Sequence, residues 1–136
     1  MSAESVIPDL QATVLCEDIR QEINGMQTLV GVLSAIPTPQ LPVRLIKLCL
    51  WTRWVCGQGT FKQTARIFTP QDASTLAEST IEFTLRDEAA TATNVQFFGG
   101  LQFEQPGLYH IEVLVEDVFK LRFPIPVVVI QQQNPK

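Results

Sequence analysis

Apolar side chains recur at every second position through most of this 136-residue chain. A period of two is the pattern of β-strands that bury one face and expose the other. Turn residues separate the alternating runs, and we find no internal repeat and no convincing long helix. The pattern predicts about eight strands, at residues 11–23, 29–32, 43–56, 61–67, 80–86, 94–103, 108–115 and 118–130.

The strongest turn signal is Asn24-Gly25, because both residues tolerate a positive φ. A type I′ turn at this dipeptide predicts a hairpin with a fixed register. In that register Ile23 lies opposite Met26, and Ile19 lies opposite Val30. We expect the sheet to begin at this hairpin and the later strands to add to it.

The segment before this turn admits two interpretations. Leu15, Ile19 and Ile23 are spaced four apart, which fits a helix that ends at Gly25. We favour a strand, because an Asn-Gly hairpin requires one before the turn. The apolar positions change parity at Cys16-Glu17-Asp18, which predicts a bend or a bulge in this strand.

Residues 43–56 form the longest predicted strand, with one core face and one partly exposed face. The core face is Ile46, Leu48, Leu50 and Trp54, and the partly exposed face is Lys47, Cys49, Trp51 and Arg53. Gly57-Gln58-Gly59 is a turn signal. We therefore expect residues 61–67 to return as the second strand of a hairpin.

Proline and glycine predict where strands are interrupted or lie at an edge. Residues 36–42 contain three prolines, so they form an extended crossover that can carry the chain between two sheets. Pro124 and Pro126 share one parity, which indicates an edge strand or a strand that changes partners. Gly99-Gly100 indicates a bulge or a close approach of another backbone. It interrupts a predicted core row formed by Val95, Phe97, Leu101 and Phe103.

These elements predict an all-β fold, a two-layer antiparallel β-sandwich of immunoglobulin-like general architecture. We expect one domain over residues 11–130, a flexible leader over residues 1–10 and a polar tail over residues 131–136. A chain of this length buries enough surface for a core without disulfides or metals.

Two short motifs resemble a bacterial family catalogued only as a domain of unknown function. The first is Arg20-Gln21-Glu22-Ile23-Asn24-Gly25 before a strand that ends near Gly31, and the second is Pro106-Gly107-Leu108-Tyr109 before the final hairpin. The resemblance implies a small β-sandwich and implies no activity. The Gly-x-Tyr step is also similar to immunoglobulin-like sandwiches, in which such a tyrosine bonds back to the backbone.

The composition of the chain bears on its cellular location and on the state of its cysteines. The N-terminus lacks the basic start and apolar core of a signal peptide, and no apolar run is long enough to span a membrane. Cys16, Cys49 and Cys56 have irregular spacing, so we expect buried or half-buried thiols rather than a disulfide framework. The sequence predicts a cytoplasmic protein with no cofactor and no bound metal.

Residues suited to catalysis are few. His110 is the only histidine, and its place between two apolar strand positions predicts a surface side chain. Glu17, Asp18 and Glu22 are close together, but carboxylates near a turn are usually solvated or paired, here with Arg20. The sequence contains no Gly-x-Ser-x-Gly elbow and no phosphate-binding loop. We therefore predict that the protein is not an enzyme.

The charges are segregated along the chain. All 14 acidic residues lie outside residues 23–71, which contain five basic residues and both tryptophans. Tryptophan and arginine are enriched at the energetic centres of interfaces. The candidate binding residues are Lys47, Trp51, Arg53, Lys62 and Arg66. The net charge of −4 makes a nucleic-acid partner the weakest choice.

The hypothesis from the sequence is a non-catalytic interaction or assembly module that recognises a protein partner, including a second copy of itself. The alternative is a small-ligand or carbohydrate binder that uses Trp51 as a stacking platform. A core role for Trp54 and chance charge segregation explain the same pattern without any function.

Overall fold

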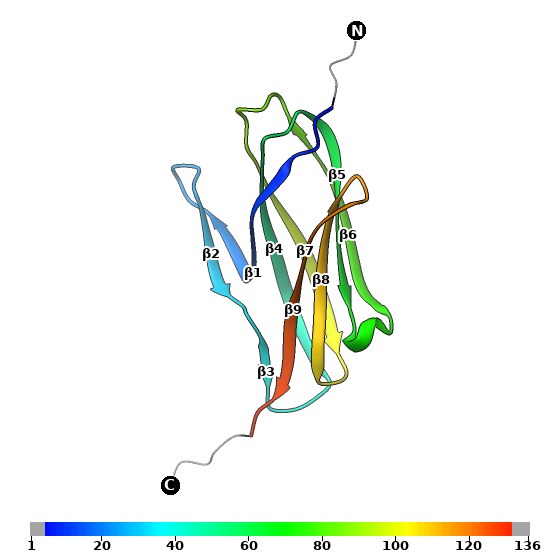
Figure 1. Cartoon of the computed structure of the whole chain (residues 1–136). Helices are drawn as coiled ribbons and strands as arrows, with labels where there is room; N and C mark the ends of the chain where they lie inside the picture. The colour runs from blue at the N-terminus through cyan, green and yellow to red at the C-terminus, as the bar shows by residue number, and fades with distance from the viewer. Residues whose placement is uncertain (1–4, 132–136) are drawn as a thin grey trace.

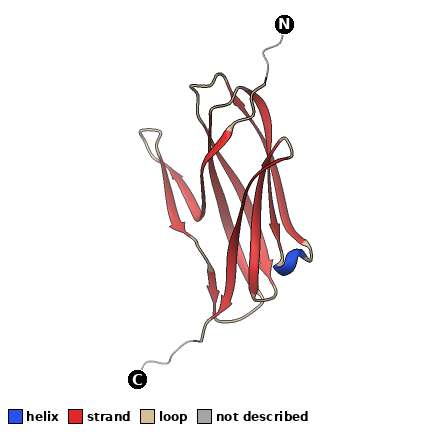
Figure 2. Cartoon of the chain, viewed as in Figure 1, coloured by secondary structure: helices blue, strands red, loops and turns tan. Residues whose placement is uncertain are grey.

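A computed structural model describes residues 5–131, and within that range the chain forms nine strands and one 3₁₀ turn (Figure 2). The strands are β1 (Asp9–Gln21), β2 (Gln27–Val32), β3 (Ile36–Thr38), β4 (Val43–Val55), β5 (Gly59–Phe68), β6 (Thr75–Leu85), β7 (Ala92–Phe103), β8 (Gly107–Val115) and β9 (Val118–Val129), and the 3₁₀ turn is Pro70–Asp72. The all-β prediction is confirmed, and the segment before the first turn is a strand, not a helix.

The strands form two sheets, one of four strands in the order β2-β1-β4-β7 and one of five in the order β3-β9-β8-β5-β6 (Figure 1). Consecutive strands β4 and β5 belong to different sheets, so the predicted hairpin of residues 43–56 and 61–67 is wrong. Its two inward faces are both largely apolar, and they meet across the core instead of side by side.

The proline-rich segment crosses between the sheets as predicted. The chain leaves the four-stranded sheet after β2, adds β3 to the edge of the other sheet, and returns to the first sheet with β4. β3 pairs in parallel with β9, but only beside Val127–Val129. The preceding part of β9, which contains Pro124, pairs on one side only among the described residues, so the edge prediction is also confirmed.

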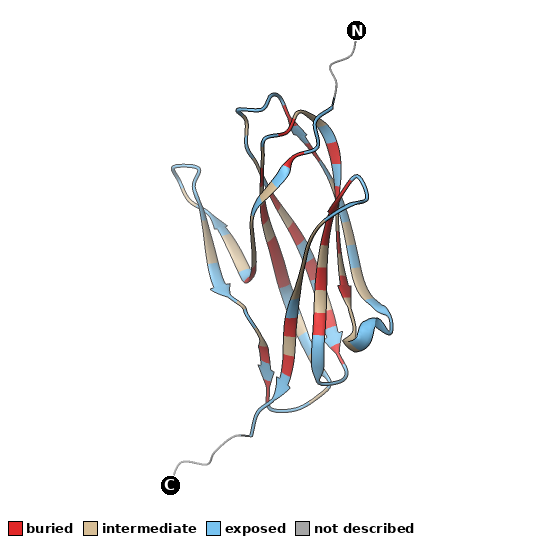
Figure 3. Cartoon of the chain, in the orientation of Figure 1, coloured by how far each residue is buried: buried red, intermediate tan, exposed pale blue. Residues whose placement is uncertain are grey.

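The core lies between the two sheets, and buried positions recur along strands of both (Figure 3). Both sheets contribute large aromatic side chains. Trp54 of β4 stacks on Phe83 of β6 with ring centroids 5.7 Å apart. Phe103 of β7 meets Tyr109 of β8 edge-on at 5.0 Å. These pairs tie one sheet to the other, since aromatic contacts of this geometry add to the stabilisation from burial.

A buried polar network also crosses the core, centred on Gln63 of β5. Its Oε1 accepts hydrogen bonds from Thr52 Oγ1 at 3.1 Å, Trp54 Nε1 at 2.8 Å and Asn94 Nδ2 at 2.8 Å. Its Nε2 donates to Gln96 Oε1 at 2.7 Å. Gln96 Nε2 in turn donates to a backbone carbonyl of β6 at 2.8 Å. Each amide therefore has partners, as a buried polar group requires.

Two predicted core residues point outward instead, because the strand faces reverse at Gly99-Gly100. Ile46 of β4 is 89% exposed and Phe97 of β7 is 58% exposed, so both predictions are wrong, and Val95 is only half-buried. In β7 the buried positions are even-numbered up to Phe98 and odd-numbered from Leu101 onward. Gly100 has φ +64°, a conformation that glycine adopts without strain. The glycines interrupt the alternation as predicted, but the opposite face is buried before them. The register of β4 and β7 continues through them without a shift, so the predicted bulge is wrong.

The first hairpin has a different turn from the one predicted. Gly25 N–H donates to Glu22 O at 3.0 Å and Glu22 N–H donates to Met26 O at 2.7 Å, which makes a three-residue loop. Of the loop residues only Gly25 has a positive φ, 87°. The register therefore shifts by one, and Ile19 faces Leu29 instead of Val30. The chain places two consecutive positive-φ residues at Glu116-Asp117 instead, at the tip between β8 and β9.

Strand β1 bends sharply midway, near Cys16-Glu17-Asp18 as predicted (Figure 1). Residues Asp9–Cys16 pair with β4, and residues Cys16–Gln21 pair with β2. Beyond Cys16 the hairpin of β1 and β2 therefore leaves the plane of its sheet. This bend creates the two surface features described below.

The edges of the domain differ from the sequence prediction. β1 begins at Asp9, and Val6 bridges to Gln58, so the part of the predicted leader that the structure describes is attached to the fold. Residues 1–4 of that leader and residues 132–136 of the predicted tail lie outside the described range. No helix in the described part of the chain is long and apolar enough to cross a membrane.

The tyrosine bond implied by the Gly-x-Tyr step is present. Tyr109 is buried, and its hydroxyl donates to the carbonyl oxygen of Gln105 at 2.9 Å. The bond closes the corner between β7 and β8.

We expect Tyr109→Phe to lower the free energy of unfolding by about 1 kcal/mol, because it removes this hydrogen bond and leaves the aromatic packing. Urea denaturation followed by far-ultraviolet circular dichroism measures the change. An unchanged midpoint would mean that the corner does not depend on the bond.

Candidate recognition surface

The five predicted binding residues do not form one surface. Lys47, Trp51 and Arg53 are in β4, whereas Lys62 and Arg66 are in β5 of the other sheet. Within each strand they alternate with core residues, so the two sets lie on opposite outer faces of the molecule. The charge segregation seen along the sequence is thus divided in space.

The outer face of β5 has acidic neighbours that offset its basic residues. Arg66 Nε lies 3.1 Å from Glu78 Oε2 on β6. Lys62 is exposed and stands opposite Glu82 in the register of β5 and β6. Exposed ion pairs of this kind contribute about 0–1 kcal/mol each. This face is therefore mixed in charge rather than basic.

Lys47 holds the bent part of β1 against β4. Its Nζ lies 2.6 Å from Asp18 Oδ1 and 5.1 Å from the centre of the Phe97 ring. The hydrogen bond from Lys47, with a second one from the Ile19 N–H, lowers the pKa of Asp18. The same hydrogen bond to Asp18 raises the pKa of Lys47.

These two shifts set the pH range over which the ion pair stabilises the fold. Because the pKa of Asp18 is lowered on folding, its contribution is present above the unfolded pKa and is lost as the pH falls through the folded value. Because the pKa of Lys47 is raised, its contribution is lost as the pH rises through the folded value. The pair is therefore fully formed at neutral pH.

We expect the pKa of Asp18 to lie below its ordinary value in the native protein and to be higher in Lys47→Met. Nuclear magnetic resonance of the Asp18 carboxyl carbon measures both titrations. Lys62→Met is the matched control, because Lys62 lies on the opposite outer face and should leave the titration of Asp18 unchanged. The same titration in all three proteins would show that Lys47 does not hold Asp18.

The hairpin of β1 and β2 folds back over the outer face of β4. Trp51 Nε1 donates to Gln27 Oε1 of β2 at 2.8 Å, although the two are on strands that do not pair. Cys16 and Cys49 stand opposite each other in register, on the same face as Trp51, and both are completely buried. Burial raises the pKa of both thiols, so they act as small apolar groups as predicted. Cys56 is exposed, contrary to that prediction.

A cleft of about 460 Å³ lies between this hairpin and the sheet. Its lining is Gln21, Gly25, Met26 and Gln27 from the hairpin side, with Trp51, Arg53 and Thr93 from the sheet. The structure thus brings together two of the five predicted residues, Trp51 and Arg53, and adds residues that the sequence did not single out. Only the predicted bend in β1 could have pointed to these additional residues, and the sequence does not give the direction of that bend.

The hairpin carries two apolar side chains that the fold leaves uncovered, and one of them, Met26, lines the cleft. Ile23 at the hairpin tip is fully exposed, and Met26 is 66% exposed. Neither contributes to the core. Arg53, on the sheet side, forms no ion pair with any residue of the described range.

The residues considered for catalysis are dispersed. His110 is half-buried on β8 between Phe68 and Pro124 in register, which differs from the open surface position predicted. Among the nearby carboxylates, Asp18 pairs with Lys47, and Glu22 lies 3.6 Å from Arg20 as the sequence suggested. The described residues contain no group of three or more side chains arranged to hold a metal ion.

A family model described as "Family of unknown function (DUF6941)" matches residues 11–128. The match covers both motifs that carried the resemblance. No curated protein matches the chain.

Proposed function

The chain belongs to this family of unknown function, and we propose that it is a non-catalytic module that recognises a protein partner through the cleft beneath its first hairpin. One observation carries the proposal. Trp51 and Arg53 form one side of a cleft whose other side includes the exposed apolar residue Met26, three residues along the hairpin from the exposed Ile23. Exposed apolar side chains beside tryptophan and arginine are typical of interface centres.

Charge supports an acidic partner surface. The lining of the cleft contains no aspartate or glutamate, and its one charged side chain, Arg53, is free of ion pairs within the described residues. A carboxylate from a partner would complete a charge-assisted hydrogen bond with the terminal nitrogens of this guanidinium. Its Nε is buried and has no partner among the described residues, so it is out of reach of a partner.

The finer sequence predictions belong to the same proposal. We interpret the two facing sheets as an immunoglobulin-like sandwich, with the Tyr109 corner as support. A cytoplasmic setting, a bacterial origin and the capacity to self-associate remain predictions.

The test is affinity capture from a lysate of the source organism with the native protein, Trp51→Ala, Arg53→Glu and the control Lys62→Glu. All three substituted positions are on outer faces, so the variants should fold, which circular dichroism checks. The proposal expects a protein that the native and Lys62→Glu baits retain and that both cleft variants lose. Capture that is indifferent to both cleft substitutions would refute it.

A small-ligand or carbohydrate site is the second candidate, because the same cleft presents the Trp51 indole as a stacking surface. Trp54→Phe leaves Trp51 as the only tryptophan, so its fluorescence reports on the cleft alone. A saturable emission change with one sugar or metabolite would favour this candidate, and constant emission across the panel would exclude it for those compounds.

A further inference from the structure

The bend in β1 leaves part of β4 without a neighbour on one side. The pairing of β1 with β4 ends at Cys16 and Cys49, whereas β4 continues to pair with β7 as far as Val43. Within the described residues, no strand pairs with Val43–Leu48 on the side that faces β3. This is an open edge about 20 Å long, inside the sheet order rather than at its end.

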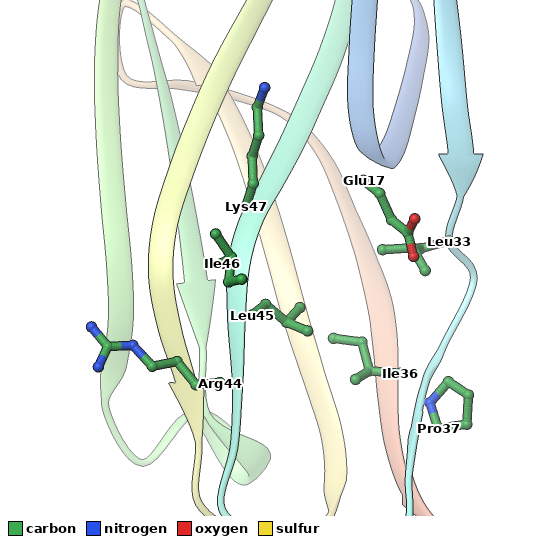
Figure 4. A pocket seen from close by; sticks show the side chains of 8 residues that line it. All are labelled: Glu17, Leu33, Ile36, Pro37, Arg44, Leu45, Ile46 and Lys47. Carbon is green, nitrogen blue, oxygen red and sulfur yellow. The ribbon is translucent and has the colours of Figure 1, made fainter.

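A groove of about 540 Å³ lies along this edge (Figure 4). β4 forms one wall, and β3 with Leu33 of the segment between β2 and β3 forms the other. Leu45 and Ile36 point toward each other across it, with Leu33 nearby (Figure 4). β3 is the edge strand of the other sheet and pairs with β9, so the open edge that lines the groove is the edge of β4. The groove is an apolar slot with unpaired backbone along its side.

We propose that this groove binds a single extended segment of a partner protein, which adds as a strand to the open edge of β4. Main-chain hydrogen bonds to an open edge provide affinity in such complexes, and pockets for alternate side chains provide specificity. The segment would place apolar side chains at alternate positions against the half-buried Leu45 and Leu33, whereas Ile36, only 4% exposed, belongs to the core. This site is distinct from the cleft beneath the hairpin and goes beyond the proposed function.

The charge of Glu17 indicates which residue type the bound segment carries at one end of the groove. The carboxylate of Glu17 lies at the bend of β1 beside Leu33 in the groove (Figure 4). Glu17 forms no ion pair with any described residue, whereas Lys47, the basic residue at the same end, is already paired with Asp18. Arg44 also lines the groove and forms no ion pair with a described residue, but its side chain points away from Ile36 and Pro37 (Figure 4). The complementary segment therefore carries a lysine or arginine where it passes Glu17.

The shape of the groove favours one strand over a folded sheet. β3 and the segment between β2 and β3 flank the open edge of β4. The edge of another folded domain would therefore meet them before it reached β4. A second copy of this chain has its own β4 behind the same barrier. We therefore assign the site to an unfolded segment and treat self-association as an outcome of the test.

The experiment measures fluorescence anisotropy of labelled peptides with the full chain. The probe is an eight-residue peptide of alternating valine and threonine with a lysine at one end. Its controls carry glutamate in place of lysine, or N-methyl groups on alternate residues. Because N-methylation removes the donors of one strand edge, we expect it to weaken binding at least about tenfold.

Two exposed positions in the groove test the site in the protein. Ile46→Asp should abolish binding of the lysine peptide, and Glu17→Lys should reverse the preference between the lysine and glutamate peptides by about threefold to fivefold. Glu82→Lys, on the other sheet, is the charge-matched control and should change nothing. Trp51→Ala should also bind normally, which separates this site from the proposed function.

The proposal is overturned if the N-methylated peptide binds as well as the parent, or if Glu17→Lys leaves the preference unchanged. No binding at millimolar peptide also overturns it. Sedimentation velocity supplies one more outcome: a native dimer that Ile46→Asp dissociates would assign the groove to a second copy instead.

Discussion

Gln63→Leu lowers the free energy of unfolding by about 3–5 kcal/mol, because several buried polar groups lose their partner at once. The donors Thr52 Oγ1, Trp54 Nε1 and Asn94 Nδ2 all point at its Oε1. Leucine has similar volume but accepts no hydrogen bond, and water has no access to a site that is fully buried. Urea denaturation followed by fluorescence measures the loss.

Gln102→Leu is the matched control for this substitution, since Gln102 is an exposed glutamine on β7. It should change the free energy of unfolding by less than about 0.5 kcal/mol. If both variants lost the same small amount, the polar network would not be a stabilising feature of the core.

Trp54→Ala should cost about 3–5 kcal/mol, the range for removing a large buried aromatic side chain. Its indole is completely buried, stacks on Phe83 at 5.7 Å and donates to Gln63. Because the two residues share a hydrogen bond, the double variant with Gln63→Leu should lose less than the sum of the single losses.

The control for Trp54→Ala is Trp51→Ala on the same strand. Trp51 is half-buried and its single hydrogen bond is exposed, so its loss should cost about 1–2 kcal/mol. Equal losses from the two substitutions would contradict the assignment of one tryptophan to the core and the other to the cleft.

The period-two pattern predicted the strands because each strand buries one face, and that constraint is local. Phe61, Ala65 and Ile67 of β5 and Tyr109 of β8 are all buried where the alternation placed them. The bond from Tyr109 was predictable for the same reason, since it spans only four residues.

The wrong predictions occur where a backbone conformation, or pairing with a strand distant in sequence, determines which face is buried and which strands are neighbours. The reversal at Gly99-Gly100 exposes Ile46 and Phe97, and a glycine pair does not say which face it will bury. The short connection after β4 permits either a hairpin or a change of sheet, and only the meeting of two apolar faces selects the latter. Sequence reasoning therefore grouped Lys62 and Arg66 with Trp51.

The candidate site was half predictable. Trp51 and Arg53 were found from residue type and charge, which depend on sequence alone. The cleft and the groove depend on where β1 leaves β4. That point is the last residue pair of the two strands, Cys16 opposite Cys49, which are far apart in sequence. Parity indicated a bend near Cys16-Glu17-Asp18, but a parity change carries no direction.

Both surface features depend on one claim, that β1 leaves β4 at Cys16 and folds its hairpin back. Amide hydrogen exchange along β4, read by nuclear magnetic resonance, tests it most directly. We expect slow exchange at every amide of residues 50–54, and exchange at alternate amides of residues 43–47 that is at least about a hundredfold faster. Uniformly slow exchange from residue 43 to residue 54 would mean that β1 continues beside β4, and neither the cleft nor the groove would exist.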